Sequence, residues 1–136
     1  MPETAAPLTP GDGQDLLARY KRAWEERDPD QAVVLFRDDA VYRFDPFEPE
    51  LAGANAIRAY WNDQVTDQAD VEFDVERVWT SGRTALASWH AAYTRRSSGE
   101  RRRIRGFMTF ELDDDGLISR FREWAISHTV SGASSG

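Results

Sequence analysis

Hydrophobic residues in the first third of the chain recur at the three- and four-residue spacing of a helix. The spacing predicts a first helix that begins near Thr9 or Asp12, either of which can cap it, and that ends near Arg27. Asp28 followed by Pro29 indicates a second helix, because proline fits the first helical position. The apolar positions predicted for these two helices are Leu16, Leu17, Tyr20, Ala23 and Trp24, followed by Ala32, Val33, Leu35 and Phe36.

The next stretch, residues 38–61, combines a strand, a turn and a helix. Val41 to Asp45 has the β-branched and aromatic character of a strand, which Pro46 and Pro49 end because proline lacks a ladder N–H. Gly53 opens a helix whose apolar positions are Ile57, Tyr60, Trp61 and Val65. Asp45 therefore lies where a strand ends beside aromatic residues, and it is a candidate for chemistry.

From Asp70 onward the apolar period becomes two-fold, which is typical of strands. Val71, Phe73 and Val75 alternate with acidic residues, and the slip of this phase at Val78 predicts a β-bulge. Three further strands are expected at Thr84 to Arg95, Arg101 to Leu112 and Leu117 to Ser127.

Helices followed by long consecutive strands predict an α+β fold in which three N-terminal helices pack on a strongly curved antiparallel sheet. A coiled sheet closed by a long helix leaves a conical hollow. We expect one domain over residues 10–130, with disordered tails at residues 1–9 and 131–136, which are rich in small and polar residues.

Composition narrows the classes of function. The 136 residues carry a formal net charge of −7, which argues against a nucleic-acid binder, and they contain no cysteine for a disulfide or a thiolate metal site. Only two histidines are present, so no metal site and no cofactor are expected. The first residues lack an apolar signal segment, and no run approaches the roughly 18 apolar residues of a membrane span. We therefore expect a cytoplasmic protein that does not enter a membrane.

For each of two candidate residues, the sequence is compatible with a functional role and with a purely structural role. Asp45 is either a general base whose pKa is raised in an apolar site, or a cap of the turn at Pro46. Tyr20 either donates a hydrogen bond to a ligand from the inner face of the first helix, or packs its ring in the core. The arginine-rich turn favours a solvated hairpin over an anion or RNA site; its arginines are Arg95, Arg96, Arg101, Arg102, Arg103 and Arg105.

Four stretches resemble a known family: LARYKRAWEERDPDQAVVLFRDDAVY, DPFEPELAGANAIRAYW, RGFMTFELDDDGLI and SRFREWA. In order and spacing they are similar to the SnoaL-like and ketosteroid-isomerase-like members of the nuclear transport factor 2-like superfamily. That family has a cone-shaped, cystatin-like α+β fold with an apolar pocket in the cone. Members commonly form dimers on the outer sheet face.

The resemblance implies roles for single residues. Tyr20 matches an oxyanion-binding tyrosine and Asp45 matches a proton-shuttling aspartate, although the spacing from the DDA motif to Asp45 is one residue longer here. A second oxyanion donor corresponds to Gly106, which has no side chain to donate. The resemblance also implies a pocket face with Leu86, Ser88, His90, Ala92, Ile104, Gly106, Met108, Phe121 and Glu123, and an outward face with Ala85, Ala87, Trp89, Ala91, Tyr93, Phe107, Trp124 and Ile126.

Other side chains complete the expected pocket. His90, mid-strand on the implied pocket face, is either an auxiliary acid or an ordinary hydrogen-bonded histidine. Glu123 is either a pocket acid or half of a cross-strand pair with an arginine. The tryptophans, Trp24 and Trp61 among them, are core residues or ring walls for a ligand.

Together these features lead us to expect a homodimer with an apolar pocket for a small cyclic organic molecule. The expected activity is cofactor-free isomerisation or cyclisation, with Asp45 as base, Tyr20 as hydrogen-bond donor and His90 as auxiliary acid. The alternative is a non-catalytic module for binding a small molecule or for dimerisation.

Overall fold

The computed structural model describes residues 6–130 and begins with a long helix, α1 (Pro10–Glu25). Its start is fixed by a capping box, since the Thr9 hydroxyl accepts from the Asp12 N–H and the Asp12 carboxylate accepts from the Thr9 N–H. Leu8 is buried and its N–H donates to the Gly82 carbonyl, so it packs onto the domain although we expected a tail there. Residues 1–5 and 131–136 lie outside the described part of the chain.

Two shorter helices follow α1. The Asp28 carboxylate caps α2 (Pro29–Val33), as the sequence predicts. Gly53, whose φ of 93° favours glycine, precedes α3 (Ala54–Tyr60), and a π-helical turn, η1 (Trp61–Val65), continues from α3. A π-turn shifts the following side chains around the helix axis and is frequent at functional sites. It brings Trp61 and Val65 into the interior.

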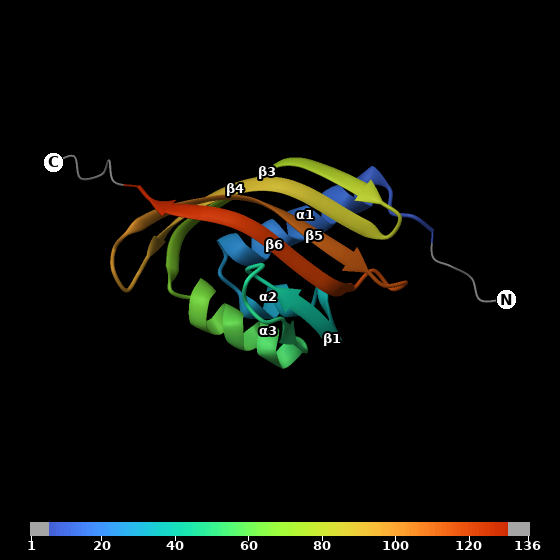
Figure 1. The fold of residues 1–136 in the computed structure, drawn as a ribbon, viewed down its shortest axis with the longest axis horizontal. Helices are drawn as coiled ribbons and strands as arrows, with labels where there is room; N and C mark the ends of the chain where they lie inside the picture. The colour runs from blue at the N-terminus through green and yellow to red at the C-terminus, as the bar shows by residue number, and fades with distance from the viewer. Residues whose placement is uncertain (1–5, 131–136) are drawn as a thin grey trace.

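Six strands form one sheet in the order β2-β1-β6-β5-β4-β3. All neighbours are antiparallel except β1 and β6, which are parallel. The strands are β1 (Phe36–Arg43), β2 (Leu51–Ala52), β3 (Gln68–Ser81), β4 (Thr84–Arg95), β5 (Arg101–Leu112) and β6 (Ile118–Thr129). Helix α1 runs along one face of the curved sheet, here called the inner face, while α2 and α3 lie below it (Figure 1). The predicted α+β cone is confirmed.

Element boundaries differ from the predictions mainly at the first strand. Phe36, placed by its helical spacing in the second helix, begins β1 instead, and that strand ends at Arg43, before Asp45. The predicted bulge is present, because the pairing of β3 with β4 shifts register between Val75 and Arg77.

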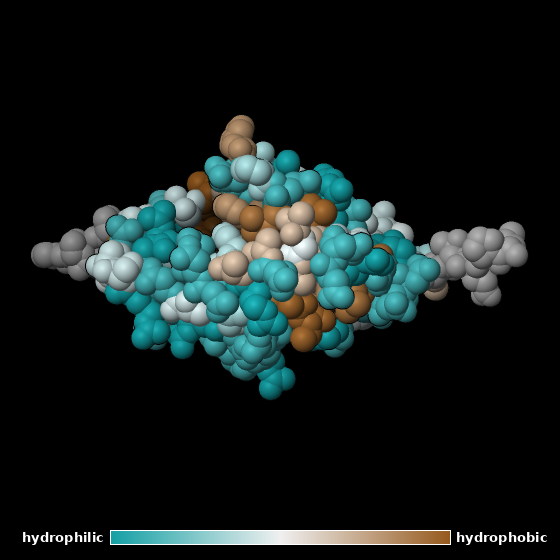
Figure 2. All heavy atoms as spheres, turned by 90° about the horizontal axis from the view of Figure 1, so that it is seen from below, coloured by the Kyte–Doolittle hydropathy of each residue, from teal (hydrophilic) through white to brown (hydrophobic). Residues whose placement is uncertain are grey.

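On the helix side of the molecule, apolar side chains gather in the middle of the surface among hydrophilic ones (Figure 2).

The predicted phase of β4 is wrong. Its buried side chains, on the inner face against α1, are Ala85, Ala87, Trp89, Ala91 and Tyr93. Leu86, Ser88, His90 and Ala92 alternate with them and lie on the outer face. Trp89 pairs with Gly106 across the β4–β5 ladder, so the large indole lies opposite a residue with no side chain.

Gly106 is required by the close approach of β5 and β6. A Cβ built at this position would overlap the Trp124 carbonyl oxygen and would lie 2.8 Å from the Ala125 Cβ. The resemblance put a missing oxyanion donor at Gly106, and the strand geometry explains why no side chain is present there.

Candidate functional site

A cavity of about 180 Å³ lies inside the cone, between α1, η1 and the inner face of the sheet. Of its twelve lining side chains, only Val65 and Ile104 lack a polar atom. The lining is therefore richer in polar groups than the apolar pocket that we expected. The other lining residues are Tyr20, Trp24, Tyr42, Tyr60, Trp61, Gln64, Gln68, Tyr93, Arg95 and Glu123.

Aromatic rings fill the rest of the cone. Tyr20 stacks on Phe121 with ring centroids 5.7 Å apart, and it meets Phe110 and Phe73 edge-on at 5.4 and 5.9 Å. Phe121 and Met108, both expected in the pocket, are fully buried in this core and do not line the cavity. The open space is thus confined to the end of the cone where Tyr42, Tyr60 and Glu123 converge.

Glu123 is the titratable group that the cavity perturbs most clearly. It lies on the inner face of β6, where it pairs with Met108 of β5. Burial, with a smaller contribution from the negative charge of Asp45, raises the pKa of the Glu123 carboxyl to about 8. Neither a hydrogen bond nor an ion pair to this carboxyl occurs within residues 6–130. The cross-strand arginine pair considered for Glu123 is absent there, which leaves a carboxyl with its proton near neutral pH.

Three tyrosine hydroxyls accompany this carboxyl. Burial, and then the charge of Glu123, raise the pKa of the Tyr20 and Tyr60 hydroxyls above the ordinary value, while a hydrogen bond with Tyr42 acts in the opposite direction on Tyr20. Burial also raises the pKa of Tyr42. All three hydroxyls therefore keep their protons across the physiological range and can donate hydrogen bonds.

Asp45 lies beside the site, and it does not line the cavity. Its Oδ1 accepts a hydrogen bond from the Phe47 N–H at 2.8 Å, which is the turn-capping role that Asp-Pro sequences favour. Its charge nevertheless reaches Glu123 and Tyr60, since it raises the pKa of both. The hydrogen bond to Phe47 supports the turn-capping interpretation of Asp45, whereas its role as a general base stays a prediction.

A polar cluster from α1, the start of β3 and the end of β4 completes the wall. The Trp24 Nε1–H donates to the Gln68 Oε1 at 2.7 Å, and Gln68 is buried. Arg95 donates to the Tyr93 hydroxyl at 3.0 Å and to Asp67 at 3.4 Å. The Asp67 carboxylate thus offsets the guanidinium charge at the cavity.

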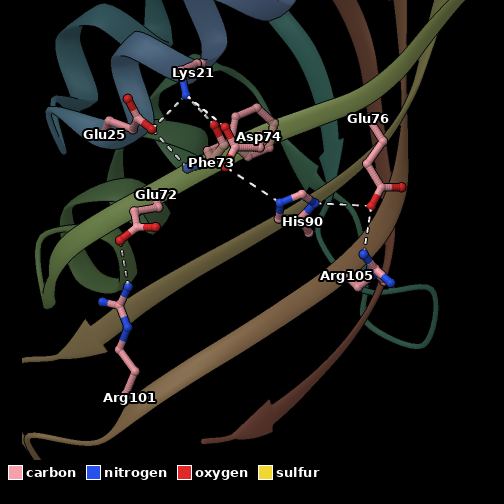
Figure 3. Close-up of polar contacts among 9 residues, drawn as sticks. All are labelled: Lys21, Glu25, Glu72, Phe73, Asp74, Glu76, His90, Arg101 and Arg105. Atoms are coloured by element: carbon pink, nitrogen blue, oxygen red, sulfur yellow. Dashed lines mark hydrogen bonds and ion pairs between the residues drawn. The ribbon is translucent and has the colours of Figure 1, made fainter.

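The predicted pocket position of His90 is wrong. Its side chain is 46% exposed on the outer face, with Nδ1 3.1 Å from Glu76 and Nε2 3.6 Å from Asp74. Figure 3 shows His90 between these carboxylates, with Arg105 on the far side of Glu76 and Lys21 on the far side of Asp74. Leu86 and Ser88 share this outer face, so they do not line the cavity either.

Of the other expected pocket residues, Trp24, Trp61 and Ile104 line the cavity with Tyr20 and Glu123, whereas Gly106 does not. The sequence interpretation missed several wall residues: Tyr42, Gln64, Gln68, Tyr93 and Arg95. Tyr60 and Val65 were placed on a buried helix face without being assigned to the site. Alternation along β1 could have indicated Tyr42, whereas Gln68 precedes the predicted strand and gave no signal.

Within the described residues, no group of three or more His, Asp or Glu side chains has the proximity to hold a metal ion. The helices between residues 6 and 130 are all too short or too polar to cross a membrane. The polar groups that line the cavity are hydroxyls, amides, two indole N–H groups, a guanidinium and the Glu123 carboxyl.

Residues 17–121 match the SnoaL-like domain family. Over 88 residues the chain is 32% identical to the ECF RNA polymerase sigma factor SigG of Mycobacterium tuberculosis (strain ATCC 25618 / H37Rv). That match covers 65% of this chain and 24% of SigG, so the chain spans about a quarter of the length of the curated relatives it matches.

Solved structures are similar in fold. SalBIII, an epoxide hydrolase/cyclase-like enzyme of pyran ring formation in the polyether salinomycin, gives a TM-score of 0.78 at 21% identity, covering 88% of this chain and 97% of SalBIII. The Δ5-3-ketosteroid isomerase of Mycobacterium sp. gives 0.74 at 18% identity, covering 86% and 98%. RV0760c from Mycobacterium tuberculosis gives 0.76 at 15% identity, covering 89% and 99%. At these identities the likeness establishes the fold alone.

Proposed function

Because the chain belongs to the SnoaL-like domain family, we propose that it is a cofactor-free acid/base enzyme for a small cyclic organic molecule. The proposal depends on one observation: the Glu123 carboxyl, without a hydrogen-bond partner in the described residues, lies in a cavity and has a pKa of about 8. It names Glu123 as the proton carrier, the role that the sequence assigned to Asp45.

A carboxyl with a pKa near the working pH is suited to proton transfer in both directions. At neutral pH most Glu123 groups hold the proton and can donate it, while a minor ionised fraction can accept one. Hydrogen-bond donors in the cavity wall can stabilise negative charge that develops on a substrate oxygen. Asp45 acts through its charge, because it keeps Glu123 protonated at higher pH.

The names of two structural neighbours agree with this reaction class. SalBIII is described as epoxide hydrolase/cyclase-like, and another neighbour is a ketosteroid isomerase. The first name refers to the formation of a ring and the second to isomerisation of a ketosteroid. They support the proposal for this chain as analogies of fold.

Proton exchange of cyclohexanone in D2O, followed by 1H NMR, tests the proposal. We expect the wild-type protein to accelerate loss of the protons next to the carbonyl, and Glu123→Gln to reduce that acceleration by roughly 10²- to 10⁴-fold, the usual contribution of general acid/base catalysis. Glu48→Gln, an exposed glutamate outside the cavity, is the matched control and should retain full exchange.

Asp45→Asn supplies a second readout in the same experiment. Removing the Asp45 charge should shift the pH profile of exchange to lower pH, because the ionised Glu123 is then less disfavoured. If Glu123→Gln exchanged as fast as the wild-type protein, the assignment of Glu123 as proton carrier would be wrong.

A second candidate function is a non-catalytic module that binds a small molecule within a larger regulatory protein. The observation that favours it is the 32% identity to a quarter of SigG, an RNA polymerase sigma factor. The exchange experiment separates the two candidates, since a binding module would bind cyclic compounds without accelerating proton loss.

We also propose that the protein forms a homodimer through the outer face of the sheet. Between residues 6 and 130, three of the five large apolar side chains that are exposed lie on this face: Trp79 at 38%, Trp124 at 40% and Ile126 at 82%. The same face carries an acidic row on β3 (Glu72, Asp74 and Glu76) and a basic row on β5 (Arg101, Arg103 and Arg105). These rows pair with each other within one copy, as Arg101 with Glu72 and Arg105 with Glu76, so the exposed apolar side chains are the observation that supports the dimer.

A further inference from the structure

The indole of Trp61 offers a hydrogen-bond donor inside the molecule that nothing in the described chain satisfies. Trp61 is 1% exposed and lines the cavity, and its Nε1 has no partner within residues 6–130. A buried donor left without an acceptor costs stability. Such a group in the wall of a cavity is suited to a ligand that brings an acceptor.

Gln68 adds donors of the same kind. An indole N–H only donates, so the Gln68 atom bonded to Trp24 Nε1 at 2.7 Å is the amide oxygen. The two N–H groups of the Gln68 amide therefore remain, and Gln68 also lines the cavity. The Tyr93 hydroxyl accepts from Arg95, which leaves its own proton to donate. The cavity wall thus offers donors to a ligand from Trp61, Gln68 and Tyr93.

The volume limits the size of the ligand. An engineered cavity of about 150 Å³ holds one benzene molecule. A cavity of about 180 Å³ therefore accommodates a single six-membered ring with one or two small substituents, and a four-ring skeleton does not fit within it.

Charge around the cavity favours a neutral ligand. The Arg95 guanidinium already faces the Asp67 carboxylate at 3.4 Å. The Asp45 carboxylate lies close enough to Glu123 to disfavour a second negative charge there, and it would oppose an anionic ligand in the same way. The donors thus match an oxygen that accepts hydrogen bonds without carrying a full charge.

We infer that the cavity binds a neutral single-ring compound bearing a carbonyl oxygen, and that the Trp61 indole N–H and the Gln68 amide donate hydrogen bonds to that oxygen. The inference rests on the proposed function, and it names the substrate class and two specificity-determining residues of the same site. Ring compounds without an acceptor, ring carboxylates and multi-ring ketones are the classes it rejects.

Calorimetric titration with four probes tests the inference on the wild-type protein. Cyclohexanone should bind most tightly. Methylenecyclohexane, which has the same shape without the oxygen, should bind roughly 5- to 150-fold more weakly, because it loses both hydrogen bonds. Cyclohexanecarboxylate and androstenedione should bind more weakly than cyclohexanone. Equal binding of methylenecyclohexane, or tighter binding of the carboxylate or the steroid, would overturn the inference without any variant.

Two tryptophan variants form a matched pair. Trp61→Phe and Trp89→Phe each remove a buried indole N–H that has no partner in the described chain, but only Trp61 lines the cavity. Trp61→Phe should weaken cyclohexanone binding roughly 3- to 10-fold and leave methylenecyclohexane unchanged, while Trp89→Phe should change neither. The same loss in both variants would contradict a direct contact with Trp61.

The two proposals fail in different ways. Binding that depends on Trp61, without any Glu123-dependent proton exchange, would reject the enzyme and retain the ligand class. Exchange that depends on Glu123, with cyclohexanone binding unaffected by Trp61→Phe, would reject the ligand contacts and retain the enzyme.

Discussion

At the residue scale, the environment of Glu123 matters more than its residue type. The sequence offered twenty-four acidic residues, and the resemblance singled out Asp45 among them. Desolvation depends on what packs around a carboxyl, which spacing along one strand does not specify. Tyr20 and Trp24 were predictable, since helical periodicity places both on the inner face of α1.

The raised pKa of Glu123 predicts a pH dependence of stability. A carboxyl whose pKa rises from 4.5 in the unfolded chain to about 8 in the folded protein contributes stability below pH 4.5, and that contribution is lost as the pH rises to about 8. The glutamine in Glu123→Gln does not titrate, so the stability of that variant does not fall with pH for this reason. Its free energy of unfolding relative to wild type should therefore increase between these pH values, by at most about 1.4 kcal/mol per pH unit.

Urea unfolding of both proteins at pH 5, 7 and 9 measures this difference. Glu48→Gln serves as the control, because Glu48 is exposed to water. A difference in unfolding free energy between Glu123→Gln and wild type that stayed constant from pH 5 to pH 9 would mean that Glu123 titrates as an ordinary carboxyl.

At the element scale, strand β4 shows what alternation can and cannot predict. Its limits, Thr84–Arg95, agree with the two-fold pattern, yet its two faces could not be told apart, because both carry mainly small or aromatic residues. The contacts that determine which face of β4 is buried are made with residues of other strands. Trp89 fits opposite Gly106, and His90 meets Asp74 and Glu76 of β3.

The sequence predicts the start of helix α1, but it does not predict the π-turn in the α3–η1 segment. The start of α1 was predictable because its capping box is local in sequence. The π-turn after Tyr60 was not, since nothing in the apolar spacing distinguishes one widened turn from a continuous helix. Of the residues of that turn that line the cavity, Trp61 was expected in the pocket and Val65 on the buried face, whereas Gln64 was missed because it is polar and breaks the apolar spacing.

At the scale of the whole molecule, the proposed dimer predicts a mass of about twice 15.5 kDa in sedimentation equilibrium. Ile126→Glu places a charge at the centre of the outer face, and it should convert the dimer to a monomer while leaving the fold intact, because Ile126 is 82% exposed. Val34→Glu, at an apolar residue that is 63% exposed and lies outside the sheet, is the control and should remain dimeric. A wild-type monomer at micromolar concentration would reject the dimer.

The whole fold also explains the raised pKa of Glu123. The curved sheet, α1 and the aromatic rings enclose most of the cone, so the half-buried carboxyl on the inner face of β6 loses part of its hydration. Asp45, held by its turn after β1, then adds a negative charge next to that carboxyl. The site thus depends on two strands that are parallel neighbours in the sheet.

The most direct test of this account is the titration of Glu123 itself, followed by the 13C chemical shift of its side-chain carboxyl in wild-type protein and in Asp45→Asn. We predict a midpoint near pH 8 in wild type and a lower midpoint in Asp45→Asn, because the neighbouring charge is removed. A wild-type midpoint near the ordinary 4.5, unchanged by Asp45→Asn, would contradict the central claim that the cone holds a proton on Glu123.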